Sequence, residues 1–236
     1  IAQAIQSMTL EEKAGQLSQA ERSKISYSDI TRYNIGSILS GGGSVPQGNT
    51  PEAWVSMINQ MNVAALKSSS GIPIIYGIDA VHGNSNVKNA TIFPHNIGLG
   101  AANDPDSMRA IGVATAKEIT AIGVDWNFAP AVSSAQDIRW GRTYESYSED
   151  IQRVSVLAVP YIEGLLSEGI LTTTKHFIGD GYTTFLTGED KNLIDRGDVT
   201  MSKEDMLAGN LGAYIAAIDA NTSAIMASFN SVNGVK

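Results

Sequence analysis

The sequence predicts an α/β fold with a parallel sheet, closed as a TIM-type (α/β)8 barrel that is incomplete after about six strands. Apolar strand patterns alternate with helical patterns along the chain, which is typical of βαβ units. An open doubly wound sheet is the alternative, but no G-x-G-x-x-G segment and no Walker-type lysine loop is present. Barrels build active sites at the carboxyl ends of their strands. Polar residues follow several predicted strands: Asp79, Asn127, Lys175, His176 and Asn230.

Composition narrows the classes of partner. The chain has 236 residues, a formal net charge of -8 and a pI near 4.8. Nucleic acids and anionic membranes are therefore not expected as partners, because no basic stripe neutralises phosphates. No cysteine is present, which excludes disulfides, zinc thiolate sites and a cysteine nucleophile. No run of eighteen apolar residues predicts a membrane helix. The chain opens at Ile1 without a signal-like segment, so we expect the numbering of a processed or trimmed product.

The first half of the chain contains clear helix signals. Thr9 and Glu12 have the spacing of a capping box and predict a helix start, with Leu10, Ala14 and Leu17 on one face. The other elements expected there are a strand over 35–39, a helix over 51–66 with Trp54, Met57, Ile58 and Met61 as its buried face, a strand over 72–79, and a short strand with a loop around 96–100.

The second half continues the alternation. Asp104 and Pro105 predict the N-cap and first position of a helix. The expected elements are a helix over 104–123, a strand over 124–132, a polar loop over 133–150, a helix over 151–168, a strand over 170–177, a helix over 202–219 and a strand over 223–230.

Lys175 and His176 are the strongest local signal for chemistry. Successive side chains of a strand point to opposite faces, so both can reach one ligand only where the strand ends or is distorted. Gly179 and Gly181 fit such a distortion. The alternative is a lysine that extends to solvent beside a structural histidine.

Two further segments carry candidate residues. Asp79, after a buried strand, is either the N-cap of the next helix or an anionic acceptor that grips a pair of sugar hydroxyls. The segment "RWGRTYESYSED" holds Arg142, whose guanidinium an adjacent glutamate can orient. An ordinary solvated loop is the alternative, although Trp and Tyr on loops usually pack or bind.

Metal and serine chemistry are disfavoured. His82, His95 and His176 with Asp79 could form a metal site, but their spacing matches no metal motif and Lys175 would repel a cation. A Ser-His-Asp triad lacks its G-x-S-x-G elbow. No cofactor is predicted.

Five motifs in order resemble glycoside hydrolase family 3. They are "GIDAVHG", "FPHNIGLGAAND", "DIRWGRTYESYSED", "KHFIGDG" and "IMASFNSVNG". Nearly the whole chain is similar to the N-terminal (α/β)8 domain of that family's β-glucosidases and exo-β-glucanases, so residues 1–236 are expected to be one barrel domain. "LIDRGD" favours the exo-glucanase branch.

The resemblance implies roles for single residues. Asp79, Arg142, Lys175 and His176 would bind the non-reducing-end glucosyl unit in subsite -1 through charge-assisted hydrogen bonds. The substrate would be a β-linked glucoside or glucan. The loop "GDGYTTFLTGEDKN" lacks the catalytic histidine of the N-acetylglucosaminidase branch, which disfavours that specificity. Phe229 stands where related glucanases have a tyrosine.

The resemblance also implies that parts of the enzyme lie outside this chain. The expected Asp nucleophile follows "SFNSVNG", and the Glu acid/base comes from a second domain. We therefore expect this chain alone to bind sugar weakly or not at all and to be inactive. Two unpaired sheet edges would be completed by the missing C-terminal part, by another chain or by self-association. A periplasmic or secreted location is expected. The alternatives are a non-catalytic carbohydrate-binding or scaffold fragment and, more remotely, an unrelated metal-dependent hydrolase.

Overall fold

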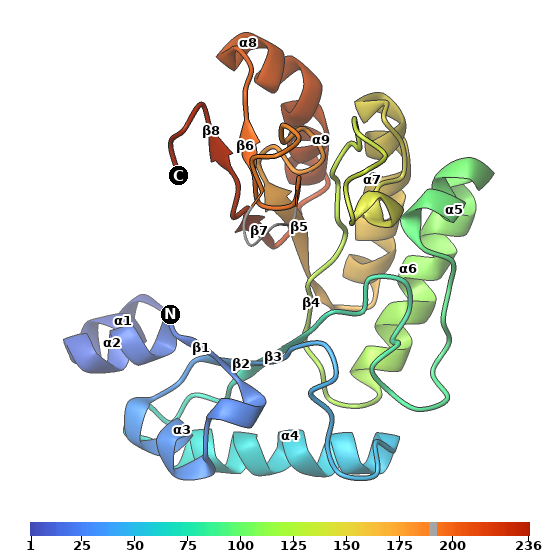
Figure 1. Cartoon of the computed structure of the whole chain (residues 1–236). Coiled ribbons are helices and arrows are strands. Elements are labelled where there is room, and N and C mark those ends of the chain that lie inside the picture. Colours follow the sequence, from blue (N-terminus) through green and yellow to red (C-terminus); the bar gives the residue numbers. More distant parts are fainter. Residues whose placement is uncertain (189–192) are drawn as a thin grey trace. The chain divides into compact units, whose positions relative to one another are not determined.

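A computed structural model describes residues 1–188 and 193–236. The chain divides into two compact units. The first unit comprises Ile1–Ala80, Asn84–Ala90 and Lys117–Asn127, and the second comprises Val81–Gly83, Thr91–Ala116 and Phe128–Lys236. Each unit is an α/β structure with parallel strands (Figure 1). No helix within the described ranges combines the length and apolar character that a bilayer crossing requires.

The strands of the first unit form one parallel run. β1 (Gln19–Glu21), β2 (Ser37–Ser40), β3 (Ile75–Ile78) and β4 (Trp126–Asn127) pair in chain order. The predicted strands over 35–39 and 72–79 correspond to β2 and β3. β1 has only three residues and was not predicted from the sequence.

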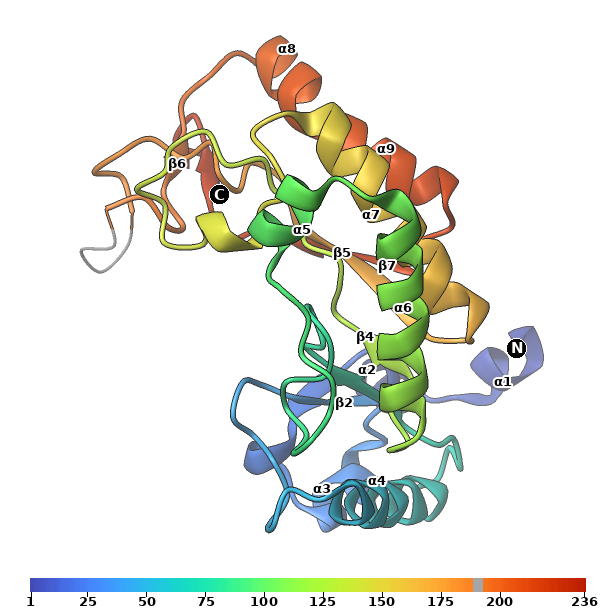
Figure 2. The ribbon, with the colours of Figure 1, turned by 90° about the vertical axis from the view of Figure 1, so that its right-hand side faces the viewer.

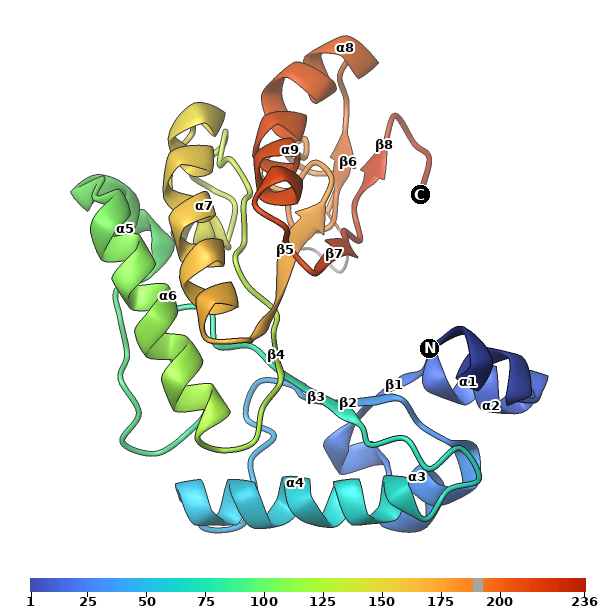
Figure 3. The same cartoon turned by 180° about the vertical axis from the view of Figure 1, so that it is seen from behind.

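Helices α3 (Tyr27–Tyr33) and α4 (Pro51–Leu66) lie side by side against the strands of this unit (Figures 1 and 3). The expected helix over 51–66 is confirmed, with its proline in the first turn and its four predicted core side chains buried. The ring of Trp54 meets the ring of Tyr76 edge-on, with 6.4 Å between centroids. The Tyr76 hydroxyl in turn lies 2.7 Å from Ser40 Oγ. The remaining helical elements of this unit are α1 (Ala2–Ser7), α2 (Leu10–Gln16) and the 3-10 turn η1 (Arg22–Lys24).

The capping box at α2 is confirmed. Thr9 Oγ1 accepts a hydrogen bond from the Glu12 amide at 3.2 Å, and Glu12 Oε2 accepts one from the Thr9 amide at 2.8 Å. Leu10 and Leu17, predicted to share a face, are 77% and 89% exposed. This helix is therefore specified by its cap rather than by burial of those leucines.

The second unit is built around β5 (Leu171–Phe177) and β7 (Ala224–Ala227), which pair in parallel. Residues 129–132 lie along the other edge of β5, where the Lys175 amide donates to Pro130 O at 3.0 Å. β6 (Asp198–Val199) and β8 (Ser231–Val232) form a separate parallel pair. The strand expected over 124–132 is therefore shorter than predicted, with only β4 assigned in it.

Helices α7 (Ile151–Ser167) and α9 (Gly212–Asp219) pack side by side over these strands (Figures 2 and 3). α6 (Pro105–Thr120), predicted from its cap and proline, runs beside α7 in the second unit, and its last residues belong to the first unit. The helix expected over 202–219 is observed as α8 (Lys203–Met206), a π-helical turn over Leu207–Leu211, and α9.

The loop predicted around residues 96–100 is wrong, because α5 (Asn96–Ala102) occupies that segment. Gly98 and Gly100 disfavour a helix in this segment when local propensity is considered alone. Here Gly100 lies against the backbone of Tyr147, and a Cβ at this position would fall 1.7 Å from Tyr147 O. Tertiary packing that only glycine permits therefore overrides local propensity.

Candidate functional site

Arg142 and Glu145 form the centre of the candidate site. A 3-10 turn, η2 (Thr143–Glu145), follows Arg142, and the Glu145 amide donates to Arg142 O at 2.9 Å. This tight turn places the two side chains together, with Nε–Oε1 and Nη2–Oε2 distances of 2.7 Å each. Asn96 Nδ2, from the first turn of α5, donates to Glu145 O at 2.7 Å and holds the turn in place. The guanidinium is thus oriented by a bidentate carboxylate.

The charges around Glu145 show which predicted residues come together. Burial, the largest single effect, raises the pKa of Glu145, but the hydrogen bonds from Arg142 and the nearby positive charges together outweigh it, so that this pKa is lowered. Those charges are the charges of Arg142, Lys175 and His176. Three of the four predicted sugar-binding residues are therefore near enough to Glu145 to act on its charge, and Arg142 contacts it directly. Burial lowers the pKa of Arg142, but the hydrogen bonds to Glu145 and the charges of Glu145, Asp180 and Asp195 together outweigh it and raise this pKa, so the guanidinium stays charged.

β5 delivers Lys175 and His176 through a distorted strand end. The register between β5 and β7 shifts between Lys175 and Phe177, and the Lys175–His176 peptide is cis. The Lys175 backbone is held on the opposite edge as well, because its carbonyl accepts from the Val132 amide at 2.9 Å. Lys175 is only 4% exposed, so the alternative of a lysine extending to solvent is wrong.

His176 pairs with Asp180 in the loop that follows. His176 Nδ1 lies 2.6 Å from Asp180 Oδ2, and both side chains are 14% exposed. Gly179, at φ 105°, permits the close turn, since a Cβ there would lie 2.7 Å from Val199 Cγ2. Ser228, just after β7, donates to Asp180 Oδ1 at 2.7 Å. Two strands thus support one imidazole–carboxylate pair.

These side chains face a pocket of about 210 Å³ within the second unit. Trp140, a candidate from the polar loop, donates from Nε1 to Asp195 Oδ1 at 3.1 Å. Phe229 is 70% exposed, and the Arg196 guanidinium lies 5.2 Å from the centre of its ring. The lining residues are Arg142, His176, Asp180, Asp195, Arg196, Met226, Ala227, Ser228 and Phe229.

Asp79 belongs to the first unit, and hydrogen bonds within that unit hold the backbone around it. It follows β3, and the next residue, Ala80, exchanges two hydrogen bonds of 3.0 Å with the buried side chain of Asn127. Asn86 Nδ2 donates to Asp79 O at 2.9 Å. Asn127, singled out by its position after a strand, therefore has a structural role in holding this strand end.

Three pocket residues, Asp180, Asp195 and Ser228, were not predicted from the sequence. Asp180 had a detectable signal, because it lies between two glycines four residues after His176. Asp195 and Ser228 lie within the quoted motifs "LIDRGD" and "IMASFNSVNG", but nothing local marked either one as a pocket residue, because only tertiary contacts bring them there. Residues 189–192, the end of the loop whose lack of histidine was noted, lie outside the described residues.

The three histidines do not share one site. His82 and His95 stack with 3.9 Å between ring centroids, and Tyr144 meets His95 edge-on. Partial burial and the charge of His82 lower the pKa of His95. His176 is instead paired with Asp180. Within the described ranges, no group of three or more His, Cys, Asp or Glu side chains has the arrangement to hold a metal ion.

Comparisons with known proteins agree on one family. The model of the glycosyl hydrolase family 3 N terminal domain matches residues 9–236. The lysosomal beta glucosidase of Dictyostelium discoideum is 30% identical over 260 residues, which cover 97% of this chain and 31% of that protein. The periplasmic beta-glucosidase of Salmonella typhimurium is 29% identical over 169 residues, covering 69% of this chain and 20% of that protein. The chain thus spans a third or less of these relatives.

Solved structures confirm the predicted fold class. An exo-1,3/1,4-beta-glucanase from a Pseudoalteromonas species superimposes with a TM-score of 0.91 at 40% identity, covering 99% of this chain and 30% of that chain. A beta-glucosidase from Listeria innocua, solved with isofagomine, gives 0.81 at 28% identity, covering 98% of this chain and 32% of that chain. The architecture is that of an incomplete (α/β)8 barrel, and the chain belongs to glycosyl hydrolase family 3 as its N-terminal domain.

Proposed function

We propose that the protein carrying this chain is a retaining β-glucoside or β-glucan exo-hydrolase that removes glucosyl units from non-reducing ends. The observation that carries the proposal is the Arg142–Glu145 pair, with Lys175 and His176 near the same carboxylate, beside a small pocket that Arg142 and His176 line. The Listeria innocua structures support the substrate class, since a mutant of that beta-glucosidase was solved with laminaribiose.

The proposed roles follow from charge and geometry. Arg142 and Lys175 donate charge-assisted hydrogen bonds to sugar hydroxyls, and His176, oriented by Asp180, offers its remaining ring nitrogen. We propose that Asp79 accepts hydrogen bonds from a pair of sugar hydroxyls. Charged side chains that are already fixed before the sugar binds can stabilise a distorted, oxocarbenium-like sugar ring, because the protein does not have to rearrange during the reaction.

We further propose that the two reacting carboxyls come from sequence outside these 236 residues. Retention requires two carboxyl groups about 5 Å apart, one of them a free nucleophile and the other a proton donor. Glu145 and Asp180 are poor candidates for either role, because Glu145 is engaged by the Arg142 guanidinium and Asp180 Oδ2 lies 2.6 Å from His176 Nδ1. The chain alone would then show no turnover, and the remaining C-terminal part of the same polypeptide is its proposed partner. The periplasmic relative supports an exported protein.

Hydrolysis of an aryl β-glucoside by the full-length protein tests the proposal. Lys175→Ala should lower kcat/KM about 10- to 150-fold, the loss expected for one hydrogen bond to a charged group. Asp79→Ala should act in the same direction. Lys24→Ala, which removes an exposed lysine, is the matched control and should leave the rate unchanged.

Three outcomes would contradict parts of the proposal. Wild-type activity of Lys175→Ala would contradict a sugar-binding role for Lys175. A preference for the aryl N-acetyl-β-glucosaminide would contradict the glucoside assignment. Glucose binding by the full-length protein without hydrolysis of any aryl β-glycoside would favour the alternative, a carbohydrate-binding or scaffold protein of the same fold.

A further inference from the structure

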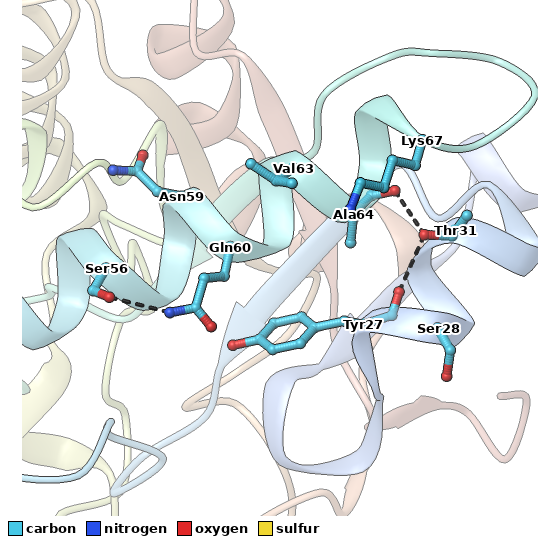
Figure 4. A pocket seen from close by; sticks show the side chains of 9 residues that line it. All are labelled: Tyr27, Ser28, Thr31, Ser56, Asn59, Gln60, Val63, Ala64 and Lys67. Carbon is cyan, nitrogen blue, oxygen red and sulfur yellow. Dashed lines mark hydrogen bonds between the residues drawn. The ribbon is translucent and has the colours of Figure 1, made fainter.

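A groove lies between α3 and α4 in the first unit (Figure 4). We call it the α3–α4 groove. Its volume is about 570 Å³, which falls within the range of ligand pockets, roughly 300–1,000 Å³. Its lining residues are Tyr27, Ser28, Thr31, Ser56, Asn59, Gln60, Val63, Ala64 and Lys67.

The two helices that form the groove are fixed to one another. Thr31 Oγ1 donates to Ala64 O on α4 at 2.7 Å and lies 3.3 Å from Tyr27 O on its own helix (Figure 4). Ser26 caps α3 in a reciprocal box with Asp29. The backbone that carries Tyr27 is therefore held at both its cap and its first turn, so the walls need little ordering when a ligand binds.

The lining combines apolar surface with polar groups, which seven of its nine side chains carry. Tyr27 is 45% exposed, and Gln60 extends from α4 toward its ring (Figure 4). The Gln60 amide has two donors and an acceptor, and one donor is used by Ser56 Oγ at 3.2 Å. Asn59 offers a second exposed amide, and Val63, 52% exposed, adds an apolar contact. A flat ring beside amides and hydroxyls suits a ligand with apolar faces and hydroxyl edges.

The charges of the lining side chains further restrict the chemical class of ligand. Lys67 is the single charged side chain among the nine lining residues, and none of those nine is acidic. Cations therefore have no counter-charge in the groove. A nucleic acid is opposed by the net charge of -8. A neutral, polyhydroxylated chain fits this lining best.

We propose that the α3–α4 groove binds a neutral β-glucan chain, with one glucosyl face stacked on Tyr27 and its hydroxyl edge hydrogen-bonded to Gln60 and Asn59. The choice of β-glucan among neutral glycans rests on the proposed function. Binding here retains a polymeric substrate on the protein through a surface that a monosaccharide or aryl glucoside does not need.

Affinity electrophoresis of the full-length protein in native gels containing soluble β-glucan tests this inference. Excess glucose in every gel occupies the pocket beside His176, so that the remaining retardation reports other glucan contacts. Tyr27→Ala should weaken the apparent affinity about 3- to 10-fold, as loss of one ring contact predicts. Gln60→Ala should weaken it less, and Tyr27→Phe should keep most of it.

Tyr33→Ala is the matched control, because Tyr33 lies on the same helix, is 51% exposed and is outside the groove. It should migrate as the wild type, and the thermal melts of both alanine variants should agree. The inference would be overturned if Tyr27→Ala were retarded as strongly as the wild type, or if Tyr27→Ala and Tyr33→Ala lost glucan affinity equally. Retardation by xylan or chitin oligosaccharides in place of β-glucan would overturn the ligand assignment.

A chemical probe tests whether the groove is open in the full-length protein. This chain has no cysteine, so Ser56→Cys introduces one at an exposed lining position. Peptide mass spectrometry should show maleimide labelling that β-glucan suppresses, whereas failure to label without glucan would mean a covered groove and would overturn the inference. Hydrolysis of an aryl β-glucoside is measured separately from glucan retardation. If hydrolysis is absent while β-glucan still retards the protein, the proposed function is contradicted but the proposed groove is not.

Discussion

The guanidinium of Arg142 and the carboxylate of Glu145 meet through two parallel hydrogen bonds of 2.7 Å. Glu145 is 12% exposed and Arg142 34% exposed, so the pair is shielded on the glutamate side and open on the arginine side. Such a pair keeps one face of the guanidinium oriented while its other donors stay available to a ligand. The arrangement makes Glu145 a positioning residue for Arg142.

Replacing Glu145 by glutamine should reduce both stability and sugar binding. Glu145→Gln removes the negative charge that pairs with Arg142 and lies near Lys175, so the free energy of unfolding should fall by about 1.5–3 kcal/mol. Urea unfolding measures this change. Glu149→Gln, an exposed glutamate in the same loop, is the control and should change stability by less than about 0.5 kcal/mol. Equal effects of the two variants would contradict a special role for Glu145.

The same pair predicts a pH dependence. The folded-state pKa of Glu145 is lowered from its ordinary value of 4.5, so the folded protein binds this proton less readily than the unfolded chain does. The stabilisation is therefore fully present above pH 4.5 and is lost as the pH falls through the folded pKa. The stability difference between wild type and Glu145→Gln should be constant near neutrality and shrink in acid. A difference that grows on acidification would contradict this sign.

Two glycine substitutions should have opposite effects. A Cβ on Gly112 of α6 would lie 2.5 Å from Tyr161 O and 3.2 Å from Gly164 Cα, so Gly112→Ala should cost about 1–3 kcal/mol by overpacking α6 against α7. At Gly212, at the start of α9, the nearest atom to a Cβ is Ile151 Cγ1 at 4.0 Å. Gly212→Ala should therefore stabilise by about 0.5–1 kcal/mol. Thermal melts of both variants measure the contrast, and destabilisation by Gly212→Ala would contradict it.

Asn127 should support Asp79 indirectly. Asn127→Ala removes two hydrogen bonds of 3.0 Å to the Ala80 backbone and should lower the free energy of unfolding by about 1–3 kcal/mol. Because Ala80 follows Asp79, glucose affinity of the full-length protein should fall as well, measured by calorimetry. Gln3→Ala, which removes an exposed amide on α1, should leave both quantities unchanged. If Asn127→Ala binds glucose with wild-type affinity, Asn127 does not help to position Asp79 for sugar binding.

Local signals predicted α2, α4, α6 and α7, whereas α3 was missed although its Ser26–Asp29 capping box is also local. The capping pairs at Thr9 and Asp104, and the proline that opens α4, act between residues that are neighbours in the chain, so the sequence alone contains the whole interaction. The buried face of α4 follows in the same way from helical spacing. Elements that depend on distant partners were missed or misassigned, namely α5, β1 and the short β4.

For the candidate site, the sequence by itself predicted Arg142, Lys175, His176 and Asp79 as sugar-binding residues, because charged side chains in sequence motifs and the order of those motifs can be read without a structure. Only the tertiary structure showed that Glu145 is the common neighbour of the first three, that Asp180 orients His176, and that Lys175 is buried. Those facts depend on a register shift in β5 and on contacts between segments far apart in the chain, which no local pattern encodes.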